Sequence, residues 1–207
     1  MTESASYYGR PVIKEPVWTP EIPIYFFAGG MAGAAATLAA LADLRGNEKL
    51  ARRAWVVALG GATASPVLLI SDLGRPERFL NMLRMFKVTS PMSVGSWILA
   101  GAGTTIAAST ANALTGLFPR LSRGTRPAAA VLGLPLATYT GALIANTAVP
   151  VWHEARRHLP FLFAAGAAAS APARIATPPP TERALDRRPP VATVIAPTAV
   201  RILAAVE

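Results

Sequence analysis

The chain has 207 residues, of which 52% are hydrophobic and only 15% charged, and its mean hydropathy is +0.38. A soluble domain carries about 25% charged residues, so this composition argues against a soluble protein and indicates a polytopic membrane protein. The formal net charge of +9 does not indicate a nucleic-acid binder, because Lys and Arg lie in short loops beside apolar runs and are not interleaved with aromatic residues.

Four apolar runs reach the length of about 20 residues that a helix needs to cross a bilayer. They cover residues 22–42, 54–71, 92–114 and 128–152. A fifth run, 159–171, begins like a span but stops short. We therefore predict an all-α fold, a polytopic transmembrane helical bundle with four full spans and an incomplete fifth. Residues 1–21 form an extramembrane N-terminal segment in this prediction.

The predicted spans are rich in Gly and Ala, and lipid gives apolar helices no hydrophobic reason to associate. Helices in a membrane therefore pack by close backbone approach through small residues. Small residues recur at spacings of three or four in three of the spans: Gly29 and Gly33, Gly60, Gly61 and Ala64, and Gly101 and Thr105. This bias predicts a tightly packed bundle.

The segment between the second and third spans, SDLGRPERFLNMLRMFKVTS, is unusually polar for so apolar a chain. Gly74 permits a turn, and Pro76 suits the first position of a short amphipathic helix. Thr89 or Ser90 is a candidate cap for the next span.

With four spans, this segment and the end of the fourth span lie on the same side of the membrane. Asp72, Arg75 and Arg78 then lie in the same layer as His153 and Glu154. Asp72 and Arg75 are either a functional acid–base pair or an ion pair that holds the loop. Arg78 is as well explained by anchoring at the membrane interface.

The fourth predicted span carries polar residues seven apart, Tyr139, Asn146 and His153, with Tyr139 near its middle. A spacing of seven puts all three on one helix face. Polar groups in lipid usually face a bundle interior or a cavity, so this face indicates a binding site. Hydrogen bonding between helices is the alternative explanation.

The chain contains no Cys, and its only His residues are the neighbours His153 and His158. It therefore cannot ligate an iron–sulfur cluster through thiolates, and the two His residues do not suit a haem held between facing helices. We expect neither a haem nor an iron–sulfur cluster in this chain.

The basic residues in the loops 43–53 and 115–127 are dense, whereas those on the other face are spread over about twice the length. This density favours a cytoplasmic position for the two loops. We therefore expect a multi-pass protein of the cell membrane with its N-terminus outside.

Residues 172–207 are rich in Pro and Arg and show no hydrophobic period. One interpretation is a disordered tail, because such a composition cannot bury a core. The other is that the natural reading frame has been lost and the rest of a longer bundle is missing.

The motifs DLGRPERF at 72–79, SPMSVGSW at 90–97 and TGALIANTAVPVW at 140–152 resemble the NrfD/PsrC family. Its members are membrane subunits of polysulfide-reductase-type oxidoreductases. The resemblance extends over residues 7–170 and implies a helical bundle of eight or more spans, with a quinone pocket in its first half and no redox metal. The chain departs from the family pattern after about residue 170. This departure favours the interpretation that the chain is a truncated or frame-shifted copy.

The resemblance implies a quinone-binding subunit of a respiratory oxidoreductase complex, with non-covalent menaquinone or ubiquinone as its cofactor. The implied partners are a ferredoxin-like iron–sulfur subunit and, through it, a catalytic subunit, for which a molybdopterin enzyme is one candidate. When the family pattern is applied to this chain, the resemblance implies that Tyr139, Asn146 and His153 bind the quinone. The proton-transfer or ion-pair residues are Asp72, Arg75, Arg78 and Glu154.

The sequence is also compatible with two other functions. A proton- or ion-translocating subunit would use Asp72, Tyr139 and His153 to line a path across the membrane. A non-functional truncated copy would have no site.

Overall fold

The computed structural model describes residues 20–72, 75–146 and 149–176, which form helices and no strands. The long helices are α1 (Glu21–Leu44), α2 (Glu48–Asp72), α4 (Pro91–Thr115), α5 (Pro119–Ala145) and α7 (Leu159–Ala176). The short elements are η1 (Pro76–Arg78), α3 (Phe79–Met82), α6 (Pro150–Glu154) and η2 (Ala155–Arg157). The predicted all-α fold is confirmed. The expected N-terminal segment up to residue 19 and the tail from residue 177 lie outside the described residues.

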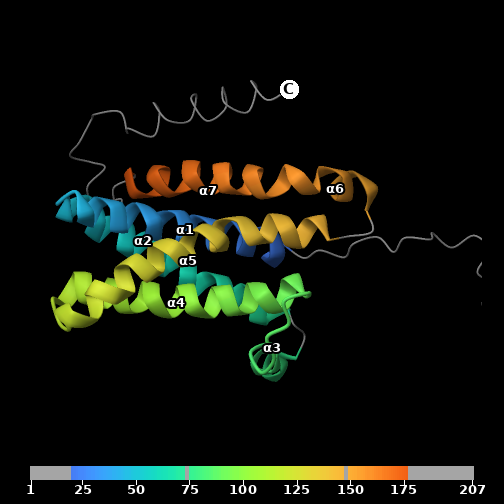
Figure 1. Ribbon diagram of the computed structural model, residues 1–207, viewed down its shortest axis with the longest axis horizontal. Helices are drawn as coiled ribbons and strands as arrows, with labels where there is room; N and C mark the ends of the chain where they lie inside the picture. The colour runs from blue at the N-terminus through green and yellow to red at the C-terminus, as the bar shows by residue number, and fades with distance from the viewer. Residues whose placement is uncertain (1–19, 73–74, 147–148, 177–207) are drawn as a thin grey trace, which may run out of the picture.

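The five long helices run side by side and antiparallel, so the chain passes along the bundle five times (Figure 1). Helix α1 packs against α2, α5 and α7, and α4 packs against α5 and α2. The short helices α3 and α6 lie at the same end of the bundle, which we call the α3–α6 end (Figure 1). The prediction that the polar loop and the end of the fourth span share one side is therefore confirmed.

Within the described ranges, four helices, α1, α2, α5 and α7, are long and apolar enough to cross a membrane. Helix α4 is not one of these four, but its 25 residues match the third predicted span, and it packs within the bundle. The fifth span was predicted to stop at residue 171, which is wrong. Helix α7 continues through Pro172 to Ala176, and its last turns stay packed because Ala171 and Ile175 are buried.

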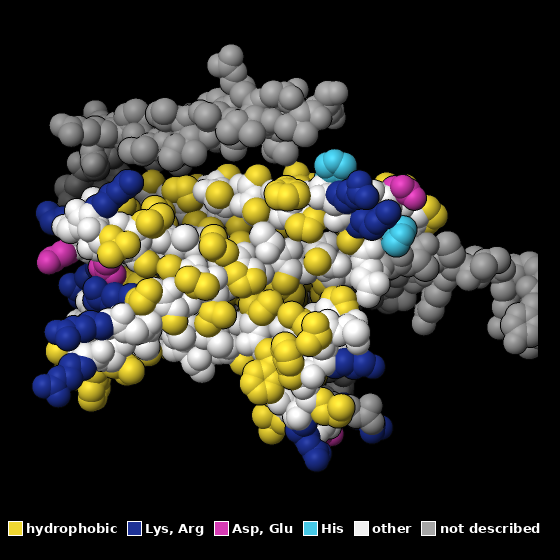
Figure 2. All heavy atoms as spheres, in the orientation of Figure 1, with side chains coloured by type: hydrophobic (Ala, Val, Ile, Leu, Met, Phe, Trp, Pro, Cys, Tyr) yellow, Lys and Arg dark blue, Asp and Glu magenta, His cyan; other side chains and the backbone are white. Residues whose placement is uncertain are grey.

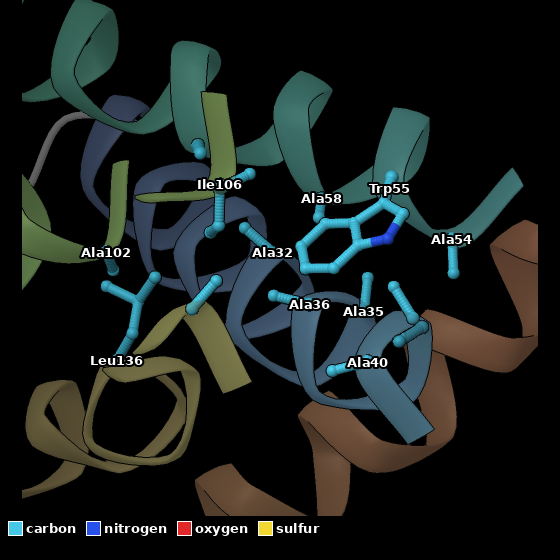
Figure 3. Close-up of a cluster of buried hydrophobic side chains, with 14 of the residues drawn as sticks. Ala32, Ala35, Ala36, Ala40, Ala54, Trp55, Ala58, Ala102, Ile106 and Leu136 are labelled. Carbon is cyan, nitrogen blue, oxygen red and sulfur yellow. The ribbon is translucent and has the colours of Figure 1, made fainter. Parts of the chain in front are cut away.

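The core is built largely from alanine, which allows the predicted close approach of helices. Ala32, Ala35 and Ala36 of α1 lie beside Trp55 of α2 (Figure 3). Trp55 is the largest of the fully buried side chains, and Ile106 of α4 belongs to the same cluster. Small side chains on α1 thus make room for one large ring on α2.

Two glycine contacts show how closely the backbones approach. A Cβ on Gly133 of α5 would lie 2.5 Å from the carbonyl oxygen of Gly33 of α1, and a Cβ on Gly61 of α2 would lie 2.5 Å from that of Ala28. Gly60, next to Gly61, has nothing within 4 Å of the same position. The predicted tight packing is therefore confirmed for Gly33 and Gly61 but not for Gly60.

The fourth predicted span is not one helix over 128–152. Helix α5 begins at Pro119 and ends at Ala145, and Asn146 is its C-terminal cap with φ −84° and ψ 62°. A new helix, α6, begins at Pro150 after Val149 in an extended conformation. Proline lacks an N–H and disfavours helical geometry in the residue before it, so Pro150 starts a helix rather than continuing one.

Candidate functional site at the α3–α6 end

The start of α4 is organised by the serines of the SPMSVGSW motif. Ser90 is the N-terminal cap of α4, and its hydroxyl accepts a hydrogen bond from the Ser93 N–H at 3.4 Å. The Ser93 hydroxyl donates to the Met85 carbonyl at 2.9 Å and accepts from the Lys87 N–H at 3.1 Å. The predicted cap is confirmed, and the same motif holds the loop after α3 against α4.

Helix α3 and the loop after it present apolar side chains to the surroundings. Leu80, Met85 and Phe86 are 69%, 73% and 61% exposed, and the Phe86 ring meets Trp97 edge-on with centroids 6.2 Å apart. Hydrophobic side chains gather on this projecting part of the molecule (Figure 2). The predicted amphipathic helix is present only in part, as η1 and a four-residue α3 that ends at Met82. The exposed apolar side chains here suit the boundary between lipid and water.

A pair of tyrosines lies inside the bundle near the same end. The hydroxyl of Tyr25 in α1 is hydrogen-bonded to the hydroxyl of Tyr139 in α5, and Tyr25 is only 4% exposed. The Tyr139 ring lies on Gly95 of α4, where an added Cβ would overlap its Cε2 atom. Three helices therefore meet at Tyr139, which lies in the last third of α5 and not near the middle of a span.

The other predicted site residues lie at the surface or in the short elements. Asn146 is exposed at the end of α5, and His153 and Glu154 are exposed in α6. Asp72 is exposed at the end of α2, Arg75 is exposed just before η1, and Arg78 is the last residue of η1. Among the predicted residues whose side chains the structure describes, Tyr139 alone lies between helices.

These residues share one end of the bundle but do not form one cluster. Helices α3 and α6 lie on opposite flanks of that end (Figure 1), so α3 and the η1 turn beside it, which follows Arg75, are not next to α6, which carries His153 and Glu154. The predicted shared face of Tyr139, Asn146 and His153 is wrong, because α5 ends before Asn146 and His153 belongs to a separate helix.

An apolar groove of about 410 Å³ lies between α1 and α7, with Ala137 of α5 in its lining. Phe26 and Phe163 meet edge-on in it with ring centroids 6.1 Å apart, and Gly30 and Gly166 also line it. The Phe26 ring is 5.4 Å from the ring of Tyr25. The groove is therefore connected to the tyrosine pair through Phe26, and neither tyrosine is among the residues that line it.

Sequence reasoning missed Tyr25, Phe26 and Gly95. Gly95 lies within a recognised motif, but Tyr25 and Phe26 look like ordinary aromatic residues at the start of a span. Thr140 was also missed: it is 1% exposed, and within the described part of the chain its hydroxyl has no hydrogen-bond partner. In the same part of the chain, no group of three or more His, Cys, Asp and Glu side chains is placed to hold a metal ion.

The chain matches the model of a known protein family. The family model described as "Polysulphide reductase, NrfD" matches residues 12–178, which is most of the chain and includes every residue of the site described above. Neither a curated protein nor a solved structure matches. The chain belongs to the NrfD family of polysulphide reductases, in which it is a membrane subunit of a reductase complex.

Proposed function

We propose that this chain binds a quinone and exchanges electrons between the membrane quinone pool and an iron–sulfur partner subunit. Membership of the NrfD family supports a role in a reductase complex. The observation that carries the quinone assignment is the hydroxyl pair of Tyr25 and Tyr139, which lies inside an apolar bundle next to an aromatic groove.

The groove between α1 and α7 suits a flat, apolar ligand. Its volume of about 410 Å³ is within the range of ligand pockets, roughly 300–1,000 Å³. Phe26 and Phe163 offer aromatic surface, and a Cβ at Gly166 would have no atom within 4 Å, so that position leaves open space. These features support binding of a quinone ring with part of its isoprenoid tail, whether menaquinone or ubiquinone.

A bound quinone would supply the two-electron, two-proton chemistry that the side chains of this chain lack. Tyr139 is the residue we assign to a hydrogen bond with a ring carbonyl, with Asn146 and His153 as further hydrogen-bonding groups towards the surface. His153 and Glu154 are exposed, and so are Asp72 and Arg75 on the other flank. We assign His153, Glu154 and Asp72 to proton exchange between the site and water, and Arg75, which keeps its proton, to pairing with Asp72.

The iron–sulfur partner would dock at the α3–α6 end. The chain contains no Cys, so it cannot hold an iron–sulfur cluster through thiolates, and a partner has to bring its cluster close to the quinone. The projecting loop around α3 offers exposed Leu80 and Phe86 beside Arg84 and Lys87, a mixture that a protein partner can cover.

We place the α3–α6 end on the outer, non-cytoplasmic face of the cell membrane, the face on which we also expect the N-terminus. The end opposite it carries a dense set of basic residues, which the positive-inside rule assigns to the cytoplasm. These residues are Arg45, Lys49, Arg52, Arg53, Arg120, Arg123, Arg126 and Arg174.

The test is whether the protein, purified from membranes in mild detergent, carries or binds a quinone. We expect quinone in its solvent extract and reduced binding in Tyr139→Phe, by about 3- to 10-fold, the value of one hydrogen bond. Thr104→Val is the matched control, because among the described residues the exposed Thr104 hydroxyl bonds only to carbonyls of its own helix. A protein that contains no quinone and binds neither menaquinone nor ubiquinone analogues would overturn the proposal.

A further inference from the structure

Tyr25 has a phenol that needs a hydrogen-bond acceptor inside the bundle. It is 4% exposed, and the Tyr139 hydroxyl is its only hydrogen-bond partner among the described residues. A buried donor without an acceptor is costly, and Tyr139 is also the less buried of the two rings. Either hydroxyl could be the donor, and the arrangement that satisfies the more deeply buried one has Tyr25 donating and the Tyr139 oxygen accepting.

This direction leaves the hydrogen of Tyr139 available. Two hydroxyl groups carry two hydrogens, and their mutual bond uses one of them. No carbonyl, carboxylate or hydroxyl other than that of Tyr25 is bonded to Tyr139 within the described ranges. A hydroxyl that accepts one hydrogen bond also becomes a stronger donor in the next. Tyr139 is thus prepared to donate to an acceptor that the chain itself does not provide.

The Tyr139 ring is held in place as well as its hydroxyl. Gly95 of α4 lets the ring lie directly on the helix backbone, and a Cβ at that position would overlap it. Because α4 confines the ring, the main remaining freedom of the phenol is rotation of the hydroxyl hydrogen about the C–O bond. The hydrogen bond from Tyr25 removes that freedom.

We propose that Tyr25 is a positioning residue of the quinone site, which turns the Tyr139 hydroxyl into a fixed donor for a ligand carbonyl oxygen. This inference rests on the proposed function and adds to it a residue and a chemical preference. A ligand with a carbonyl is favoured over one of the same shape without it, because only the carbonyl accepts the Tyr139 hydrogen.

The experiment compares duroquinone with durene, the tetramethylbenzene of similar outline that lacks both carbonyls, on the purified full chain. Tyr25→Phe should weaken duroquinone binding by about 3- to 10-fold, and Tyr139→Phe by at least as much. Because Tyr25 acts through Tyr139, the double variant should bind duroquinone as Tyr139→Phe does. Binding of durene should be the same in all four proteins.

Each outcome bears on a different statement. An unmodified protein that binds no quinone overturns the proposed function. If it binds duroquinone, a neutral Tyr25→Phe, or a double variant with the sum of both losses, overturns only the role of Tyr25. Equal losses for duroquinone and durene would show a merely structural effect and also overturn it.

Infrared spectroscopy gives a second measurement that does not depend on affinity. The carbonyl stretch of duroquinone bound to the unmodified protein should lie below that of the free compound, and Tyr25→Phe should shrink this shift. Should Tyr25→Phe not fold, an unshifted carbonyl stretch in the unmodified protein would still overturn the inference.

Discussion

The guanidinium of Arg126 lies 3.2 Å from the carboxylate of Asp43, and this ion pair joins the first turns of α5 to the end of α1. The same carboxylate oxygen accepts a hydrogen bond from Trp55 Nε1 of α2 at 2.9 Å, and Arg126 donates to the side-chain oxygen of Asn112 of α4 at 3.0 Å. Four helices are therefore linked through one polar cluster at the end opposite the tyrosines.

Asp43→Asn should destabilise the bundle, because it leaves Arg126 without its counter-charge. The two side chains are 30% and 17% exposed, so water screens the pair only in part, and we expect a loss of about 1–3 kcal/mol. The measurement is the thermal unfolding midpoint in detergent. Glu48→Gln, the loss of an exposed carboxylate in α2, is the control, and equal midpoints for the two variants would contradict the prediction.

Gly95→Ala should displace the Tyr139 ring and lower quinone binding by more than 10-fold, at least the value of one lost hydrogen bond. The matched control is Gly103→Ala in the same helix, since a Cβ there has no atom within 4 Å. That variant should bind quinone normally and be equally or slightly more stable, by up to about 1 kcal/mol. Binding titrations on both proteins check this, and normal binding by Gly95→Ala would show that the ring can move without consequence.

Gly61→Ala should weaken the contact between α1 and α2, whereas Gly60→Ala should not. The new methyl at Gly61 would lie 2.5 Å from the Ala28 carbonyl oxygen, and overpacking of this kind costs about 1–3 kcal/mol. The same methyl at Gly60 meets nothing. Thermal unfolding midpoints distinguish the two neighbours, and equal values would mean that the two backbones separate easily.

Ser93→Ala should loosen the loop between α3 and α4. Its hydroxyl is the acceptor for the Lys87 N–H and the donor to the Met85 carbonyl, so both groups lose their partner. Amide hydrogen exchange at Lys87 should become about 3- to 10-fold faster, the value of one hydrogen bond. Ser122→Ala is the control, because the Ser122 hydroxyl donates to the Pro119 carbonyl within α5, and it should leave the exchange rate at Lys87 unchanged. An unchanged rate in Ser93→Ala would mean that other contacts hold the loop.

Single cysteines can establish the orientation, because the chain has no Cys of its own. Asn81→Cys lies in α3, and Gly124→Cys lies at the opposite end, where a side chain meets nothing within 4 Å. In sealed right-side-out vesicles, a membrane-impermeant maleimide should label Asn81→Cys at once and Gly124→Cys only after the vesicles are opened. The reverse pattern would place the α3–α6 end in the cytoplasm.

Much of the architecture could be predicted because its causes act within a few residues. Run length locates the five long helices, and the Ser90 cap begins α4 where the motif predicts. Local spacing also led to one wrong prediction, the shared helix face of Tyr139, Asn146 and His153. Seven-residue spacing from Tyr139 to His153 assumed an unbroken helix, although Pro150 was visible as a reason for a break.

The sequence by itself determined an all-α membrane bundle, the shared end of the polar loop and the fourth span, and the absence of thiolate-held metal. Only the tertiary structure decided that Tyr25 meets Tyr139, that Gly61 rather than Gly60 packs on α1, and that α3 and α6 lie on opposite flanks. The physical reason is that lipid-facing and core-facing sides of these helices are both apolar. Their hydrophobic pattern therefore says little about how each helix is rotated, and that rotation depends on all of its neighbours at once.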